Sequence, residues 1–375
     1  MTTYVEIHAI QTVPPSCINR DDTGAPKTAT YGGVTRARVS SQAWKSAIRD
    51  DFNHRLDPKE IGTRSTQIVS EIAKSVVQLD PDLTDSAVDL GVAAMEAAGF
   101  KKPVAKTRGK DKTQGDPETG YLVFLSQRQI DALAKAAVEA SSEPDPGKAM
   151  KAAKVKDLVN ADHSVDIALF GRMIADSTDL NVDAACQVAH ALSVHEAEPQ
   201  FDFYTAVDDA RARDEDEVDA GAGMMGTVGF VSATFYRYAA INVDQLQLNL
   251  GSREAAQRAV VAFLQGFIES MPTGKINTFA NATRPAAVVV TVAEGQPTSL
   301  VEAFEDPVRA DGGFVKPAIA RLTAHASEVF ETWRKPKATF VVGLPSAIDG
   351  LQELGQHVSA DELYSQVSSQ ISESA

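Results

Sequence analysis

The chain has 375 residues, 43% of them hydrophobic, with a formal net charge of −15 and a sequence pI near 4.9. This acidic balance excludes a protein that coats nucleic acid through bulk positive charge, and no apolar run reaches the roughly 18–20 residues of a membrane span. The first ten residues, MTTYVEIHAI, lack the basic, apolar, small-residue order of a signal peptide, so we expect a cytoplasmic protein. Two cysteines are too few for a disulfide framework or a cysteine-based zinc site, and no nucleotide-binding glycine motif is present, so we expect no metal or other cofactor.

The N-terminal third begins with a strand and a helix. Residues 4–11 alternate apolar and polar side chains, which predicts a half-buried strand. A long loop rich in Pro, Asp, Thr and Gly follows. Ser40 or Ser41 then provides an N-cap for a helix over about 42–55, and Pro58 lies just past its end.

The next block, residues 58–180, is dominated by alanine-rich segments with helical period. It predicts a helical subdomain inserted into another fold. Within it, the Gly- and Lys-rich stretch 101–120 is expected to be a loop without fixed structure.

The remainder alternates strands and helices. We expect helices near 182–194 and over 253–271, a short helix in the tail, and strands over 198–207, 229–243, 286–292 and 337–344. Strand 4–11, helix 42–55, strands 198–207 and 229–243, helix 253–271 and strand 286–292 together give the order β-α-β-β-α-β. This is the ferredoxin-like order of RNA-recognition-motif domains, an α+β fold.

Charge is segregated along the chain. Residues 20–55 carry seven cations and four acids, whereas residues 208–219 carry seven acids and two arginines. Only particular surfaces could therefore meet phosphates. Positions near the 42–55 helix start suit an anion, since backbone N–H groups and the helix dipole favour negative charge there. The residues concerned are Ser40, Gln42, Lys45 and Arg49, with Arg20 and Lys27 in the preceding loop.

Several of these features also have ordinary structural interpretations. The helix could be a capped amphipathic helix with a solvated basic face. Asp21 and Asp22 could ligate a metal, but adjacent carboxylates are typical turn formers and no third ligand lies nearby. Aromatic residues around the predicted 198–207/229–243 hairpin, such as Phe203 and Tyr204, could stack on bases or fill a core. His190 and His195 are interpreted as core or surface histidines rather than metal ligands.

Four blocks carry a longer resemblance: residues 7–49, 165–173, 203–209 and 235–251. They resemble the CasC family of the RAMP superfamily, the backbone subunit of the type I-E CRISPR Cascade complex. The resemblance implies a right-hand shape with an RNA-recognition-motif palm (1–57, 181–197 and 231–375, the last including the tail), helical fingers (58–180) and a thumb hairpin (198–230).

The resemblance also implies a function and partners. Several copies would line a CRISPR RNA, grip its phosphates, kink it at regular intervals and leave its bases free to pair with target DNA, together with other Cascade subunits and without catalysis. The implied RNA-binding residues are Arg20, Lys27, Ser40, Gln42, Lys45, Arg49, Met173, Phe203, Tyr204 and Thr205. The implied contacts to target DNA are Lys148, Lys151, Lys154 and Lys156. Where the family usually has a Trp-Phe pair, this chain has Phe203-Tyr204.

Two other functions remain as alternatives. A metal-dependent endoribonuclease, of the kind found among type III backbone subunits, would use Asp21 or Asp22. A general RNA chaperone is disfavoured because the chain is acidic and lacks a broad basic face.

Overall fold

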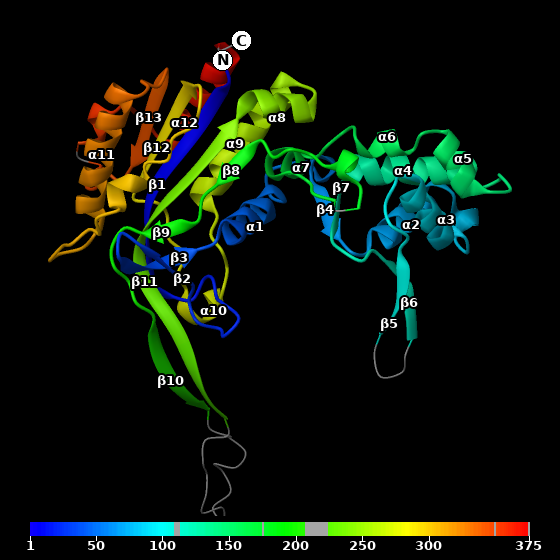
Figure 1. Ribbon diagram of the computed structural model, residues 1–375, viewed down its shortest axis with the longest axis horizontal. Helices are drawn as coiled ribbons and strands as arrows, with labels where there is room; N and C mark the ends of the chain where they lie inside the picture. Colours follow the sequence, from blue (N-terminus) through cyan, green and yellow to red (C-terminus); the bar gives the residue numbers. More distant parts are fainter. Residues whose placement is uncertain (109–112, 175, 207–223, 349, 374–375) are drawn as a thin grey trace, which may run out of the picture. The chain divides into compact units, whose positions relative to one another are not determined.

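The computed structural model describes residues 1–108, 113–174, 176–206, 224–348 and 350–373 (Figure 1). The chain divides into two compact units. The first, here called the palm, comprises Met1–Ile48, Val188–Ala240 and Phe263–Ala375; the second, the fingers, comprises Arg49–Gln187 and Ile241–Ala262.

The palm is built on one large sheet with the strand order β14-β13-β12-β1-β11-β9-β3-β2, and β8 and β10 also pair with β11. Its strands are β1 (Thr3–Ser16), β2 (Thr28–Tyr31), β3 (Val34–Val39), β8 (Cys186–Val188), β9 (Ala191–Ser193), β10 (Gln200–Ala206), β11 (Met224–Asn242), β12 (Ala287–Glu294), β13 (Ala338–Gly343) and β14 (Gln356–His357). The predicted strands at 286–292 and 337–344 are β12 and β13.

The four central strands, β12-β1-β11-β9, have the ferredoxin-like arrangement. Helix α1 (Ser41–Phe52) follows β1 after the short strands β2 and β3, and helix α9 (Arg253–Glu269) lies between β11 and β12 in the chain. Both β1–β12 and β9–β11 are antiparallel. The β-α-β-β-α-β order and the α+β fold class predicted from the sequence are therefore confirmed.

The second strand of this order is β9 (Ala191–Ser193), not the predicted strand at 198–207. Residues 182–194, predicted as a helix, contain β8 and β9, while residues 198–207 contain β10, which pairs with the first part of β11 outside the four central strands. The reason is tertiary pairing: Leu192 lies opposite Tyr236 of β11 on one side and Arg38 of β3 on the other. Pairing on both edges outweighs the helical propensity of an alanine-rich segment.

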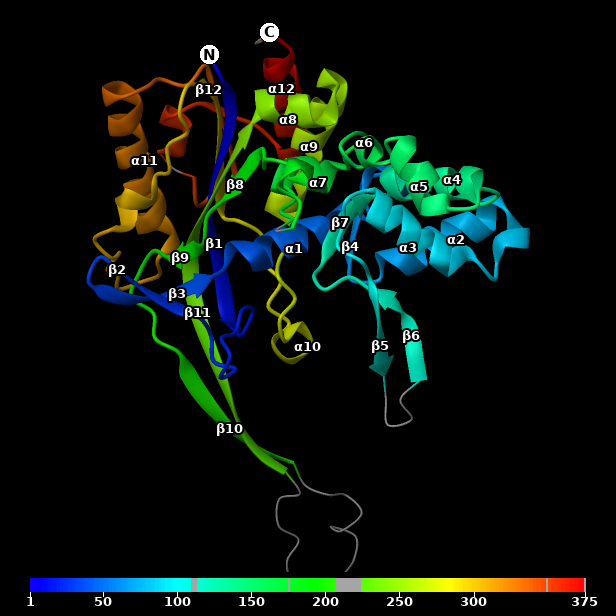
Figure 2. The same cartoon turned by 45° about the vertical axis from the view of Figure 1, so that its right-hand side comes forward.

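Successive side chains of strand β11 point to opposite faces of the sheet, so they belong to two different cores. Tyr236 and Tyr238 belong to the core that includes α11 (Val315–Thr332), whereas Phe235 packs with Trp44 of α1. Figure 2 shows α11 on the opposite side of the sheet from α12 (Ala360–Glu373). The tail helix was predicted; α11 was not.

Strand β1 is buried on both faces, so the prediction of a half-buried strand was wrong. Glu6 and His8, on the supposedly exposed face, are 3% and 1% exposed. They are covered because α11 and the segment before it pack on that face, and hydrogen bonds replace their hydration: the Tyr236 hydroxyl meets Nδ1 of His8, and Thr298 N–H donates to Glu6.

The fingers pack helices around a core of their own. The helices around this core are α2 (Ile68–Leu79), α3 (Ala87–Ala97), α4 (Gln127–Ala140), α5 (Pro146–Ala152) and α6 (Lys156–Val159), and strand β7 (Val123–Ser126) contributes to it. The fingers also contain α7 (Val165–Phe170), α8 (Val243–Leu250) and strand β4 (Gly62–Ser65). A capping box between Ser126 and Gln129 starts α4.

The fingers also contain a hairpin that the sequence pattern did not predict. Within 101–120, expected to be an unstructured loop, the described residues form β5 (Val104–Arg108) and β6 (Thr113–Glu118), which Figure 2 shows as a paired ribbon. Pairing between β5 and β6 thus gives regular structure to residues whose polar, Gly- and Lys-rich composition is typical of a loop. None of the described helices combines the length and the apolar character that a membrane span requires.

Candidate nucleic-acid interface

The loop before β2 is organised by Asp21. Its Oδ1 accepts hydrogen bonds from the Thr23 hydroxyl at 2.7 Å, the Thr23 N–H at 2.9 Å and the Ala25 N–H at 3.0 Å. The hydroxyl bond of Thr23, together with these backbone bonds, lowers the pKa of Asp21. The carboxylate therefore serves as a turn former in this structure and presents the exposed Arg20 beside it.

Backbone hydrogen bonds join this loop to β3 and to the start of α1. Lys27 N–H donates to the Asn19 carbonyl oxygen at 3.0 Å, and Arg38 N–H donates to the Lys27 carbonyl oxygen at 2.9 Å. The Asn19 side chain accepts from Ser40 N–H at 2.9 Å. The fold thus brings together the predicted residues Arg20, Lys27 and Ser40.

Helix α1 begins as the sequence predicted. The Ser40 hydroxyl oxygen accepts from Ala43 N–H at 3.3 Å, so Ser40 caps the helix, and the residue is only 6% exposed. Trp44 and Ile48 are buried, whereas Gln42 is exposed and Lys45 is half-buried. We call the side chains of Arg20, Lys27, Gln42 and Lys45 the basic strip.

Arg49, in the same helix, belongs to the fingers and has a partner there. Its Nε donates to Oδ2 of Asp166 at 3.2 Å, and its guanidinium lies 4.7 Å from the centre of the Phe124 ring. The Asp166 carboxylate is fully buried, and burial raises its pKa against the opposing effects of Ser164 and Arg49. Arg49 therefore neutralises a buried charge, a role that its helical spacing did not reveal.

The predicted thumb is the hairpin of β10 with the first part of β11, seen in Figure 1 as a two-stranded ribbon. Phe203 is 63% exposed, and Tyr204 is 39% exposed. The register pairs Tyr204 with Gly226, and a Cβ on Gly226 would lie 2.6 Å from the Tyr204 hydroxyl. The missing side chain of Gly226 thus makes room for the tyrosine ring.

Two further apolar side chains share the face of Phe203 and were missed by the sequence analysis. Phe201 lies two residues away in β10, and Met225 is paired with the exposed Thr205; they are 63% and 65% exposed. The alternating positions of Phe201, Phe203 and Thr205 in the sequence could have revealed that these side chains share one face. The thumb thus carries an exposed apolar face, here defined by Phe201, Phe203 and Met225.

The thumb base touches the loop that carries Arg20 and Lys27. Phe201 is paired with Gly229, and an added Cβ on Gly229 would lie 2.8 Å from Cδ of Pro26 and 3.2 Å from the Phe201 ring. Pro26 also forms a backbone bridge with Arg20. Exposed aromatic rings and loop cations therefore adjoin within the palm. The aromatic residues farther along β11, Phe235, Tyr236 and Tyr238, are buried in the core and cannot stack on bases.

The remaining predicted residues lie in the fingers. Met173 is 83% exposed. Its neighbour Arg172 is buried and donates to the carbonyl oxygens of Leu180 and Val159, which fixes the backbone next to Met173. Lys148, Lys151 and Lys154 are exposed on and after α5. Lys156 instead forms an ion pair with Asp179.

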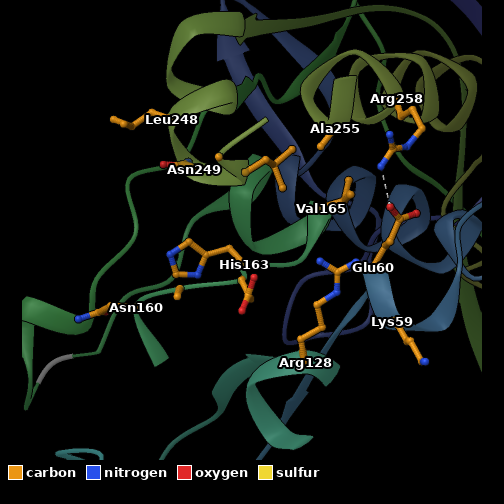
Figure 3. A pocket seen from close by; sticks show the side chains of 14 residues that line it. Lys59, Glu60, Arg128, Asn160, His163, Val165, Leu248, Asn249, Ala255 and Arg258 are labelled. Carbon is orange, nitrogen blue, oxygen red and sulfur yellow. Dashed lines mark hydrogen bonds and ion pairs between the residues drawn. The ribbon is translucent and has the colours of Figure 1, made fainter. Parts of the chain in front are cut away.

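The fingers also contain a pocket of about 400 Å³ (Figure 3). Lys59, Arg128 and Arg258 line it, but Glu60 and Asp162 do as well, and Arg258 donates to Glu60 at 3.0 Å. Positive and negative groups are thus mixed in this pocket, which makes it less suited to a polyanion than the basic strip.

Among the described residues, no group of three His, Cys, Asp or Glu side chains is placed to hold a metal ion. Asp22 is exposed beside the turn formed by Asp21. The acidic segment 208–219 lies outside the described residues.

The chain is similar to known proteins over almost its whole length. The CT1975-like protein family matches residues 5–366. A solved chain titled "CRISPR RNA-guided surveillance complex, pre-nicking" is 34% identical, with 98% of this chain and 100% of that chain covered and a TM-score of 0.84. A second, titled "CRISPR RNA-guided surveillance complex", is 30% identical, with 97% and 99% covered and a TM-score of 0.70. A search of curated proteins found no match.

Proposed function

The chain belongs to the CT1975-like protein family, and from that premise we propose that it is a non-catalytic RNA-binding subunit of a CRISPR surveillance complex. It corresponds to the CasC backbone subunit of type I-E Cascade. Several copies line one guide RNA and hold it while its bases pair with target DNA. Both similar solved structures are chains of CRISPR RNA-guided surveillance complexes, which supports the assignment of this chain to such a complex.

The main support for the proposal is that loop cations lie next to exposed aromatic rings in a chain that is acidic overall. Arg20 and Lys27 lie on a loop whose Pro26 packs at the thumb base near Phe201. Net charge is −15, so these cations mark a local path for phosphate rather than a general attraction. Cations bind the phosphodiester chain, and rings offer faces to unstacked bases.

This combination suits a protein that must accept any guide sequence. Phosphate contacts fix the register and orientation of a nucleic acid without reading its bases. Base–aromatic stacking tolerates every base because each has a π-face. A subunit with both features can grip and bend RNA while the Watson–Crick edges stay available, and base pairing with the target then provides specificity.

Copurification tests the proposal. The tagged chain is expressed with its neighbouring genes and a CRISPR array, and the bound RNA is sized. We expect one RNA length and several copies of the chain per RNA. Arg20→Ala combined with Lys45→Ala should lower the RNA yield, whereas Lys316→Ala, an exposed cation on α11, should not. An RNA-free complex from the wild-type chain would refute the proposal.

A separate cleavage assay tests whether the chain lacks ribonuclease activity. Labelled RNA is incubated with the purified chain and Mg²⁺, and the same is done with Asp21→Ala/Asp22→Ala. We expect no cleavage by either protein. Metal-dependent cleavage that disappears in the double variant would instead establish the endoribonuclease.

A further inference from the structure

Arg38 and His190 meet at the palm surface next to the basic strip. Nη1 of Arg38 lies 3.2 Å from Nδ1 of His190, and Nε of Arg38 donates to the Thr28 carbonyl oxygen at 3.1 Å. Sheet pairing holds both residues in place, because Arg38 lies in β3 opposite Leu192 of β9 and His190 directly precedes β9. The Arg38 N–H also bonds to the Lys27 carbonyl oxygen.

The contact determines which hydrogen-bond donors the pair presents. A guanidinium can only donate, so Nδ1 of His190 must accept, and the neutral imidazole then carries its hydrogen on Nε2. In the described part of the chain, no hydrogen bond is made by Nε2 of His190 or by Nη2 of Arg38. The pair therefore offers unused donors from both side chains.

The electrostatic surroundings of the pair are positive. Burial lowers the pKa of His190, and the charges of Arg38 and Lys27 lower it further. Among the described residues, no carboxylate forms an ion pair with Arg38 or Lys27. Two cations that form no ion pair among the described residues, with a histidine beside them, favour an anionic ligand.

We propose that Arg38 and His190 bind a phosphodiester of the guide RNA and so extend the basic strip along β3. The inference rests on the proposed function. One phosphate oxygen accepts from an Nη of Arg38, and another accepts from Nε2 of His190. The contact is independent of base identity, like the rest of the strip.

Filter binding of the full chain to single-stranded RNA over a range of salt concentrations tests the assignment. Arg38→Ala should weaken binding roughly tenfold, as expected for a lost charge-assisted hydrogen bond, and reduce the salt slope by about 0.7. His190→Ala should weaken binding about fivefold without changing the slope, because it removes a neutral donor. Lys316→Ala is the matched control on α11 and should leave both affinity and slope unchanged.

A second measurement separates a phosphate contact from a structural effect, since Arg38 also supports Thr28. RNA with neutral methylphosphonate linkages should bind the wild-type chain more weakly, and this penalty should be smaller for the Arg38→Ala/His190→Ala double variant. Full affinity in His190→Ala, or an unchanged penalty in the double variant, would overturn the assignment. If Arg20→Ala weakens binding while these variants do not, only this inference fails; if the wild-type chain binds no RNA, the proposed function fails as well.

Discussion

The guanidinium of Arg237 lies 3.7 Å from the centre of the Trp44 ring, so a cation from β11 packs directly on the helix that carries Gln42 and Lys45. Arg237 is 2% exposed. It donates to the Gln11 side chain at 2.5 Å and to the Phe267 carbonyl oxygen at 2.6 Å. A buried guanidinium thus ties α1, α9 and β1 to the central strand.

Replacing Arg237 with methionine should destabilise the protein by about 3 kcal/mol, because the Gln11 side chain and the Phe267 carbonyl lose their donor inside the core. Urea unfolding measures the change. Arg321→Met is the matched control; its Asp306 partner is largely exposed, so we expect at most about 0.5 kcal/mol. Equal stability of Arg237→Met and the wild-type chain would show that the buried bonds contribute nothing.

His8 makes stability depend on acid pH. Burial lowers its pKa to about 3. The Tyr236 hydroxyl accepts from Leu300 N–H at 2.9 Å and lies 2.9 Å from Nδ1 of His8, so a neutral imidazole can accept the hydroxyl hydrogen at Nδ1. A protonated imidazole cannot accept that bond.

In the unfolded chain His8 takes up its proton near pH 6.5, whereas in the folded chain it stays neutral down to about pH 3. Stability from this group is complete above about pH 6.5 and falls as the pH drops toward 3. The slope is at most about 1.4 kcal/mol per pH unit. His8→Gln should flatten this part of the profile in urea unfolding at successive pH values, while His54→Gln, at an exposed position, should not. An equally steep profile in His8→Gln would assign the acid sensitivity to other groups.

The Arg49–Asp166 pair should show coupling in a double-mutant cycle. Arg49→Ala leaves the buried Asp166 carboxylate without its cation, so we expect a loss of about 1–3 kcal/mol, reduced by the partial exposure of Arg49. Asp166→Asn in the Arg49→Ala background should recover part of that loss. Thermal unfolding of the four proteins gives the coupling free energy, and additive effects would contradict the geometry.

This pair also shows where sequence reasoning reaches its limit. The spacing of Ser40, Lys45 and Arg49 correctly predicted a capped helix with cations outside its buried face. It could not reveal that Arg49 meets a carboxylate 117 residues away, because periodicity contains no information on tertiary partners.

The lack of information on tertiary partners also explains the errors in the predicted fold. The β-α-β-β-α-β order followed from local patterns, since long strands and amphipathic helices carry strong periodic signals. Strand β9 has only three residues and exists because β3 and β11 pair with both of its edges. Likewise, Phe201 was a visible alternating aromatic, but its exposure depends on the register with Gly229.

Phe203 provides the most direct test of the thumb. Its ring is exposed on the face it shares with Phe201 and Met225, so Phe203→Ala should have little effect on unfolding. If the ring stacks on a base, the same change should cost about 1–3 kcal/mol of RNA affinity without altering the salt slope, because no phosphate contact is lost. Leu344→Ala is the control: it removes a side chain of similar exposure, 59%, from the palm. Unchanged RNA affinity in Phe203→Ala, with Phe203→Tyr also neutral, would mean that no base rests on this ring and would leave Tyr204 as the thumb residue to examine.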